Sequence, residues 1–120
     1  MRYLLDTNIV IGILKGPGDA RDLVDHHGAA RSVCAASLIT RMELLGFQGI
    51  TDESERQILI ELNAMRVLPL GYEVERAVIA LRRRTRIKLP DAIIAATAQV
   101  HDLELLTLDA RLAASLRSLH

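Results

Sequence analysis

The chain has 120 residues and is half apolar, so we expect one hydrophobic core and a single domain over residues 1–120. Its fifteen acidic and fifteen basic residues balance, which excludes capture of a polyanion by net charge alone. The one cysteine, Cys34, excludes an internal disulfide, and no apolar run is long enough to span a membrane, so we expect a cytoplasmic protein.

Short apolar runs alternate along the chain with segments of helical periodicity, which begin at capping residues and end at glycine or proline. We expect Thr7 or Asn8 to cap the first helix and Ser37 to cap the third. Strands that alternate with helices favour parallel pairing with helices on both faces. The predicted fold class is therefore α/β, with three layers and a central parallel sheet of four to five strands flanked by helices. In chain order, the pattern predicts a strand at 3–6, helices at 7–14 and 19–27, a strand at 32–36, helices at 37–45 and 51–64, a strand at 66–70, helices at 72–85 and 90–101, a strand at 105–108 and a helix at 110–119.

Three acidic residues fall at positions that a parallel sheet would bring to one edge. Asp6 ends the first strand, and Asp109 follows the run "LLTL" at the same end of the last strand. Asp91 lies in the first turn of the apolar helix "KLPDAIIAATA", where the helix N-terminus favours negative charge. Ligands of open α/β sheets bind beyond the carboxyl ends of the strands, so we expect the site at this edge.

A fourth acid, Glu43, lies in the predicted helix "SLITRMELLG". It borders the apolar arc of that helix, so we expect it at the margin of the core and not on the far solvent side. The arc that we expect to face the core consists of Leu38, Ile39, Met42, Leu45 and Gly46.

Each acid alone has an ordinary structural explanation. Asp6 and Asp109 are suitable helix caps, Asp91 complements a helix dipole, and a glutamate in an amphipathic helix is usually on the surface. Together, however, converging carboxylates would repel and raise one another's pKa. A hard divalent cation such as Mg²⁺ or Mn²⁺, which takes oxygen ligands, would offset that repulsion. The single cysteine has no partner, and we interpret His26 and His27 as a solvated face, so no soft-metal set competes.

Four stretches make the chain similar to a known family: "LLDTNI", "SLITRMELLG", "KLPDAIIAATA" and "LLTLDARL". They span nearly the whole chain in order, and the sequence resembles the PIN-domain proteins, most of all the VapC ribonuclease toxins of prokaryotic toxin–antitoxin pairs. The resemblance implies a PIN-like fold with a cluster of acids at the carboxyl edge of its sheet. It also implies Mg²⁺- or Mn²⁺-dependent hydrolysis of RNA by an activated water, which leaves a 5′-phosphate and a 3′-hydroxyl.

The resemblance assigns roles to the four acids by position. Asp6, Glu43 and Asp91 match the three acids of the family. Asp109 matches the polar or acidic position of the last motif. We expect all four to be catalytic, with Asp6 and Asp91 as the main metal ligands and the other two as ligands or water-positioning groups.

Polar residues of the motifs match as well. Thr7 and Asn8 match the pair after the first acid, and Thr107 matches the threonine of the last motif, so we expect them to support the acids by hydrogen bonding. Many relatives carry a further acid and an aromatic residue where this chain has Arg111 and Leu112. This departure leaves open a catalytically weak PIN-fold protein that binds RNA or a partner without cutting. A receiver-like domain phosphorylated at its first acid is a third hypothesis.

The same resemblance implies partners. These are an antitoxin, whose tail covers the acidic groove, often with an arginine, and a second copy of the chain in a homodimer. The apolar residues Ile9, Val10, Ile13 and Leu14 could form an interface or belong to the core. A basic run shortly before Asp91 is either a solvated helix end or a phosphate contact for RNA. The run consists of Arg82, Arg83, Arg84, Arg86 and Lys88.

Overall fold

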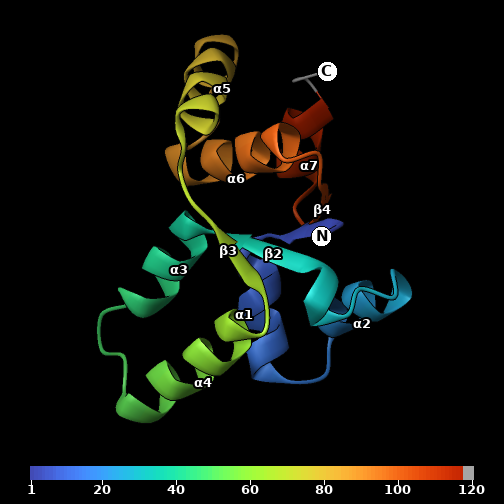
Figure 1. Cartoon of the computed structure of the whole chain (residues 1–120), viewed down its shortest axis with the longest axis vertical. Helices are drawn as coiled ribbons and strands as arrows, with labels where there is room; N and C mark the ends of the chain where they lie inside the picture. The colour runs from blue at the N-terminus through green and yellow to red at the C-terminus, as the bar shows by residue number, and fades with distance from the viewer. Residues whose placement is uncertain (118–120) are drawn as a thin grey trace.

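The computed structural model describes residues 1–117, and its strands are β1 (Tyr3–Leu5), β2 (Cys34–Ser37), β3 (Arg66–Leu68) and β4 (Glu104–Leu106). They form one parallel sheet of four strands, as predicted, and the order of the strands is β3-β2-β1-β4 (Figure 1). In the register of the sheet, Tyr3 is level with Cys34 on one side and with Glu104 on the other. The carboxyl ends of β1, β2 and β4 therefore meet at one edge of the sheet.

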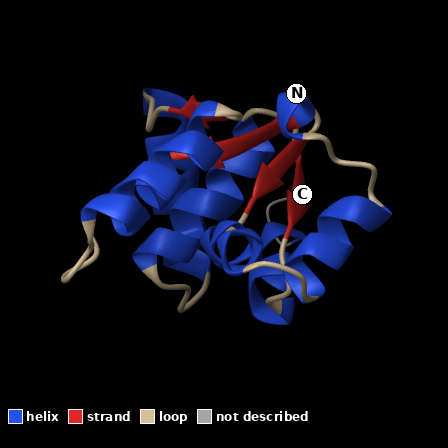
Figure 2. Cartoon of the chain, turned by 90° about the horizontal axis from the view of Figure 1, so that it is seen from below, coloured by secondary structure: helices blue, strands red, loops and turns tan. Residues whose placement is uncertain are grey.

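The α-helices of the described residues are α1 (Thr7–Lys15), α2 (Asp19–His26), α3 (Leu38–Leu45), α4 (Asp52–Asn63), α5 (Tyr72–Arg84), α6 (Leu89–Val100) and α7 (Ala110–Arg117), with a 3₁₀ turn η1 at Arg31–Val33. In Figure 1, α1, α2 and α4 lie below the sheet, and α5, α6 and α7 lie above it. Helix α3 lies at the side of the sheet and contacts α1, α4 and α6. Figure 2 shows the chain from below, with helices making up most of it around the short strands.

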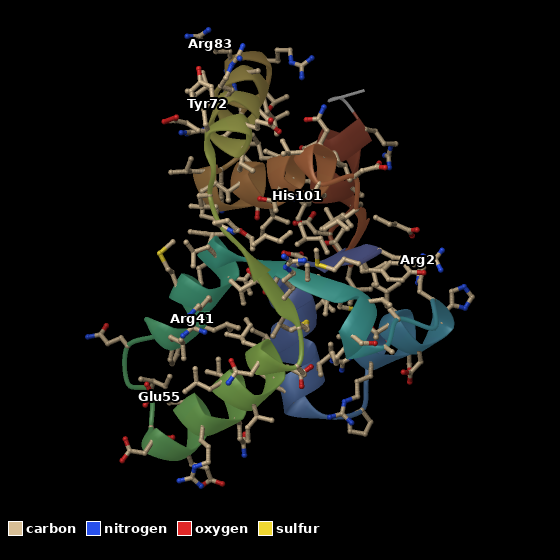
Figure 3. The ribbon with its side chains drawn as sticks, in the orientation of Figure 1. Arg2, Arg41, Glu55, Tyr72, Arg83 and His101 are labelled. Atoms are coloured by element: carbon tan, nitrogen blue, oxygen red, sulfur yellow. The ribbon has the colours of Figure 1, made fainter. Side chains whose placement is uncertain are left out.

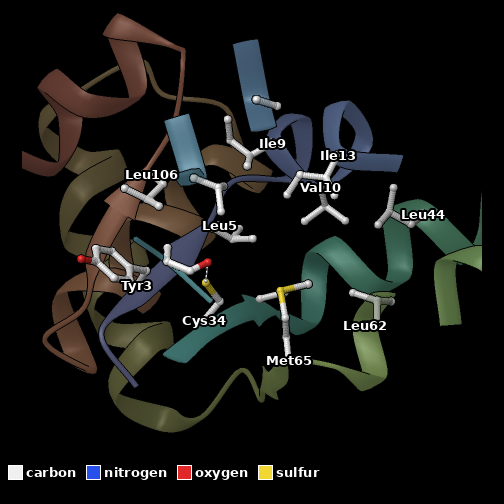
Figure 4. Close-up of a cluster of buried hydrophobic side chains, with 14 residues drawn as sticks. Tyr3, Leu5, Ile9, Val10, Ile13, Cys34, Leu44, Leu62, Met65 and Leu106 are labelled. Atoms are coloured by element: carbon white, nitrogen blue, oxygen red, sulfur yellow. Dashed lines mark hydrogen bonds between the residues drawn. The ribbon is translucent and has the colours of Figure 1, made fainter. Parts of the chain in front are cut away.

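Alternate side chains of the central strand enter different cores, because successive residues of a strand point to opposite faces. Tyr3 and Leu5 lie in a buried cluster with α1, α2 and α4, whereas Leu4 lies in a second cluster with α5, α6 and α7. Figure 4 shows the first cluster, in which the Cys34 thiol donates to the Ala29 carbonyl oxygen at 3.7 Å. Burial raises the pKa of this thiol, so it acts as a core side chain.

The predicted helices are present, with differences at their ends. The Ser37 hydroxyl caps α3 as predicted, since it accepts a hydrogen bond from the Ile39 amide at 3.1 Å. The prediction for α1 was wrong: its N-cap residue is Asp6, and Thr7 already lies inside the helix. The last predicted helix, 110–119, is described as far as Arg117, and its final residues lie outside the part of the chain that the structure describes.

The buried face of α3 differs from the predicted arc. Thr40 and Leu44 are buried, whereas Met42 is 49% exposed. The reason is that α3 turns the Thr40 and Leu44 side toward α1 and α4, and only Ile39 of the arc packs against the second core cluster. A hydroxyl group therefore occupies a position that periodicity alone would assign to an apolar residue.

The apolar side of α1 belongs to the core. Ile9, Val10 and Ile13 are buried in the first cluster, and Leu14 packs against it. The first three therefore cannot present an interface to a second copy of the chain. Within residues 1–117, no helix is both long enough and apolar enough to cross a membrane.

Candidate functional site

Asp6 lies at the carboxyl edge of the sheet, directly after the central strand. Its backbone amide donates to the Leu106 carbonyl oxygen at 3.1 Å, which keeps the backbone in register with β4. The residue is only 4% exposed. Its Oδ2 atom accepts a hydrogen bond from the Thr107 hydroxyl at 2.8 Å, as expected for a supporting threonine. The carboxylate is thus held by a neutral donor at a buried position.

The electrostatic surroundings of Asp6 favour its protonated form. Burial is the largest influence and raises the pKa of the carboxyl group. Hydrogen bonds from the Thr107 hydroxyl and the Thr7 backbone act in the opposite direction, and the nearby carboxylates of Asp91 and Asp109 raise the pKa again. The net shift is upward. Two like charges, those of Asp91 at the start of α6 and Asp109 before α7, therefore act on one buried carboxylate.

Glu43 reaches the same region from α3 through a hydroxyl of α1. The Thr7 hydroxyl donates to Glu43 Oε1 at 3.0 Å, and Thr7 Oγ1 lies 2.7 Å from Thr40 Oγ1. Because Thr7 follows Asp6 directly, these bonds tie Glu43 of α3 to the backbone next to Asp6, the acid that follows β1. Thr40 was not predicted from the sequence, although its position one helical turn before Glu43 places both on the same side of α3.

Asp109 caps the last helix, α7, which was the ordinary structural explanation for an acid at this position in the sequence. Its Oδ1 atom accepts from the backbone amides of Arg111 at 2.9 Å and Leu112 at 3.3 Å. The Asp109 amide donates in turn to the Thr107 hydroxyl oxygen at 3.0 Å. Capping occupies one carboxylate oxygen, and the charge still acts on Asp6.

A cleft of about 690 Å³ opens between α1, α3, α4 and the start of α6. Asp6, Glu43 and Asp91 line it together, with Thr7 and Asn8 beside them. The cleft thus brings three of the four predicted acids to one concave surface, and Asp109 does not line it. The remainder of its wall is largely apolar and includes Ile11, Leu14, Leu44, Phe47, Ile50 and Ile58.

In the part of the chain that the structure describes, the residues that line this cleft include none of the predicted basic run, although Lys88 is the N-cap of α6, three residues before Asp91. Within the described residues, the basic side chain that lines it is Lys15, at the end of α1, which sequence reasoning missed. The arginines that end α5 are exposed, and Figure 3 shows Arg83 at the outer end of that helix. Contact of the run with RNA stays a prediction.

The histidine pair is not simply a solvated face. His26 is exposed, but His27 is partly buried, with Nδ1 2.9 Å from the Leu23 carbonyl oxygen and Nε2 3.2 Å from Glu104 Oε2. These contacts join the end of α2 to the start of β4. The interpretation of His27 from the sequence was therefore wrong, because β4 lies next to it only after folding.

The donor set at the cleft suits a hard cation. Its acidic part offers carboxylate and hydroxyl oxygens. Among residues 1–117, no group of three or more His, Cys, Asp and Glu side chains is arranged to hold a metal ion. Mg²⁺, however, keeps several waters and is commonly bound by one or two carboxylates. The carboxylates of Asp6 and Asp91, which line the same cleft, fit that mode of binding.

Comparison with known proteins agrees with this arrangement. Residues 3–115 match the PIN domain family. Ribonuclease VapC10 of Mycobacterium tuberculosis is 34% identical over 113 residues, which cover 88% of this chain and 81% of the relative.

Solved structures share the fold. A chain of a toxin-antitoxin complex from Klebsiella pneumoniae is 34% identical, with a TM-score of 0.77 over 91% of this chain and 88% of that chain. A chain of VapBC-1 from nontypeable Haemophilus influenzae is 22% identical and has a TM-score of 0.79, with 98% of this chain and 94% of that chain covered. The match to residues 3–115 and the 34% identity to VapC10 show that this chain belongs to the PIN domain family.

Proposed function

We propose that the chain is a Mg²⁺- or Mn²⁺-dependent endoribonuclease that acts in the cytoplasm as the toxin of a toxin–antitoxin pair. The observation that carries the proposal is that Asp6, Glu43 and Asp91, which come from three different parts of the chain, line one cleft. Carboxylates brought to one surface repel one another, and a divalent cation bound between them relieves that repulsion. The 34% identity to a protein named as a ribonuclease supports RNA as the substrate.

Asp6 and Asp91 are the residues that we expect to hold the metal ion. Both line the cleft, and the Thr107 hydroxyl fixes the orientation of the Asp6 carboxylate through its Oδ2 atom. When bound, a divalent cation would offset the phosphate charge and lower the pKa of a coordinated water. Carboxylates alone would repel the anionic phosphate, which is why this chemistry needs them in the role of ligands.

Glu43 and Asp109 have supporting roles in this proposal. Glu43 lines the cleft with one oxygen held by Thr7, so its second oxygen can accept a hydrogen bond from a water molecule and orient it. Asp109 adds negative charge near Asp6 while its Oδ1 atom caps α7. Asn8 lines the cleft and can donate its amide to substrate.

The shape of the cleft supports an antitoxin as partner. Beyond the acids, its wall is apolar, and Phe47 is 68% exposed there. A partner segment with apolar side chains and one arginine would cover this wall and pair with the carboxylates. The solved relatives from Klebsiella pneumoniae and Haemophilus influenzae are named as toxin-antitoxin and VapBC structures, which supports the same kind of partner here. We also propose a homodimer, and sedimentation of the purified chain tests it.

The proposed activity is tested with purified chain, total RNA and either Mg²⁺ or a chelator, followed by mapping of the cut ends. We expect wild type to cleave RNA only when Mg²⁺ is present and to leave 5′-phosphate ends. We expect no cleavage by Asp6→Asn. Asp22→Asn is the matched control, because Asp22 is an exposed acid of α2 away from the cleft. Cleavage by Asp6→Asn at the wild-type rate would overturn the proposal.

A catalytically weak RNA-binding or partner-binding PIN protein is the alternative. It is favoured by Arg111 and Leu112, which stand where many relatives have an acid and an aromatic residue, and by the lack of a direct three-ligand group in residues 1–117. It predicts retention of RNA in a filter-binding assay and no new 5′ ends after long incubation with Mn²⁺.

A further inference from the structure

Thr40 is a buried hydroxyl residue within the candidate site. It is 0% exposed, yet it lies on α3 where the other buried residue is the apolar Leu44. Its Oγ1 atom lies 2.7 Å from Thr7 Oγ1, and within residues 1–117 this is its side-chain hydrogen bond. Thr7 Oγ1 is also 3.0 Å from Glu43 Oε1. Three side chains thus form a continuous chain of hydrogen bonds between α3 and α1.

The donor and the acceptor in each of these hydrogen bonds follow from counting protons. A hydroxyl group donates one proton and an ionised carboxylate only accepts. The bond to Glu43 therefore takes the proton of Thr7, so the bond between the hydroxyls must use the proton of Thr40. In the reverse arrangement, an oxygen lone pair of Thr7 would face the Glu43 carboxylate without a proton between them. Only one direction satisfies both bonds.

We propose that Thr40 is a positioning residue, whose hydroxyl donates to Thr7 and so fixes Thr7 to donate to Glu43. The inference rests on the proposed function for its consequence, because it sets how Glu43 faces the cleft. Thr40 and Glu43 lie one turn apart on α3, and Thr7 follows the buried Asp6. The bonds therefore fix Glu43 relative to Thr7, the residue directly after Asp6, at the wall of the cleft.

Two substitutions at Thr40 separate the hydroxyl from the methyl group. Thr40→Val keeps the shape and removes the donor, whereas Thr40→Ser keeps the donor and removes the methyl group. Thr97→Val is the matched control, since Thr97 is also 0% exposed but donates to the Ile93 carbonyl oxygen of its own helix at 2.6 Å. The measurements are the calorimetric titration of each protein with Mn²⁺ and the kcat and KM for RNA cleavage.

We expect Thr40→Val to lose roughly 10-fold in kcat or in Mn²⁺ affinity, the lower end of what loss of an outer partner costs, because Thr40 acts on the water-positioning Glu43 through Thr7. Thr40→Ser should stay within about threefold of wild type, and Thr97→Val should match wild type in both measurements. The proposal is overturned if Thr40→Ser loses as much as Thr40→Val, because packing would then explain the effect. Wild-type binding and cleavage by Thr40→Val would overturn it as well.

A test in chelator keeps this inference distinct from the proposed activity. The urea midpoints of Thr40→Val, Glu43→Ala and the double variant should be non-additive, because the two residues act on each other through Thr7. When Thr7 is also replaced, as Thr7→Val, the shifts in urea midpoint caused by Thr40→Val and Glu43→Ala should become additive, because the hydroxyl that links the two residues is gone. Additive shifts in both backgrounds would overturn the hydrogen-bonded chain. If wild type neither binds Mn²⁺ nor cuts RNA while the coupling is present, the proposed function fails and the role of Thr40 in orienting Glu43 stands.

Discussion

The amino and carboxyl edges of the sheet differ in how their charged side chains are paired. At the amino edge, charged groups meet partners of opposite sign: Arg31 pairs with Glu61, and His27 lies 3.2 Å from Glu104 and pairs with it when protonated. At the carboxyl edge, carboxylates converge on the buried Asp6. A charge pair that is complete within the chain leaves neither charge without a partner. Like charges brought together at a buried position destabilise the fold. A cation that binds between them removes this repulsion, so its binding is favourable.

Removing one acid from the carboxyl edge should have the largest effect on activity. We expect Asp91→Asn to lower RNA cleavage by about 10³-fold or more, since metal-ion catalysis contributes several kcal/mol. In chelator, the same variant should melt at a slightly higher temperature than wild type, because its neutral side chain no longer repels Asp6. A melting temperature in chelator below that of wild type would contradict this explanation of the carboxyl edge.

Removing one acid from the amino edge should have the opposite pattern. Glu61→Gln leaves the partly buried Arg31 without its charge partner, and we expect a loss of about 1–2 kcal/mol in the free energy of unfolding. Cleavage of RNA should stay within about threefold of wild type, because the pair lies away from the cleft. Glu55→Gln is the control, since Glu55 is an exposed acid of the same helix (Figure 3). A larger loss of stability from Glu55→Gln than from Glu61→Gln would remove the distinction between the edges.

The pH dependence of stability tests the raised pKa of Asp6. In the folded chain this pKa lies above its unfolded value, so the contribution of Asp6 to stability is complete in acid and is lost as the pH rises through the folded pKa. In chelator, wild type should therefore lose stability relative to Asp6→Asn as the pH rises from about 4 to neutrality. With Mn²⁺ the sign reverses, because the ion binds the ionised carboxylate. Urea unfolding at several pH values measures the stability of both proteins with chelator and with Mn²⁺. Plots of stability against pH that run parallel for wild type and Asp6→Asn would contradict the prediction.

Salt dependence of RNA binding should show the smallest effect. Lys15 lines the cleft, so Lys15→Gln should reduce the slope of log K against log salt by about 0.7, the value for one contact with single-stranded RNA. Neutralising Arg82, Arg83 and Arg84 together should flatten the slope further, because RNA longer than the cleft extends over neighbouring helices. An unchanged slope in the triple variant would assign these arginines to a solvated helix end.

Local patterns were sufficient to predict the elements and the parallel direction of the strands. The alternation of strands with helices predicted the parallel sheet, and the positions of Asp6 and Asp91 relative to those elements predicted that they would meet. Both depend on spacing within short segments, which the sequence displays directly.

Contacts between distant segments could not be predicted in this way. The burial of Thr40 depends on Thr7, which lies 33 positions away, and the contact of His27 with Glu104 depends on β4 joining the sheet beside β1. The predicted face of α3 was wrong for the same reason, because a hydroxyl was buried through a partner on another helix. Such pairs become visible only when the packing of the helices is known.

A calorimetric titration of wild type and of Asp6→Asn with Mn²⁺ measures whether the acids at the carboxyl edge of the sheet bind a cation. If the acids of the carboxyl edge form a cation site, wild type should take up Mn²⁺ with saturation, and the variant should bind at least about tenfold more weakly. No saturable uptake by wild type, even with RNA present, would contradict the account.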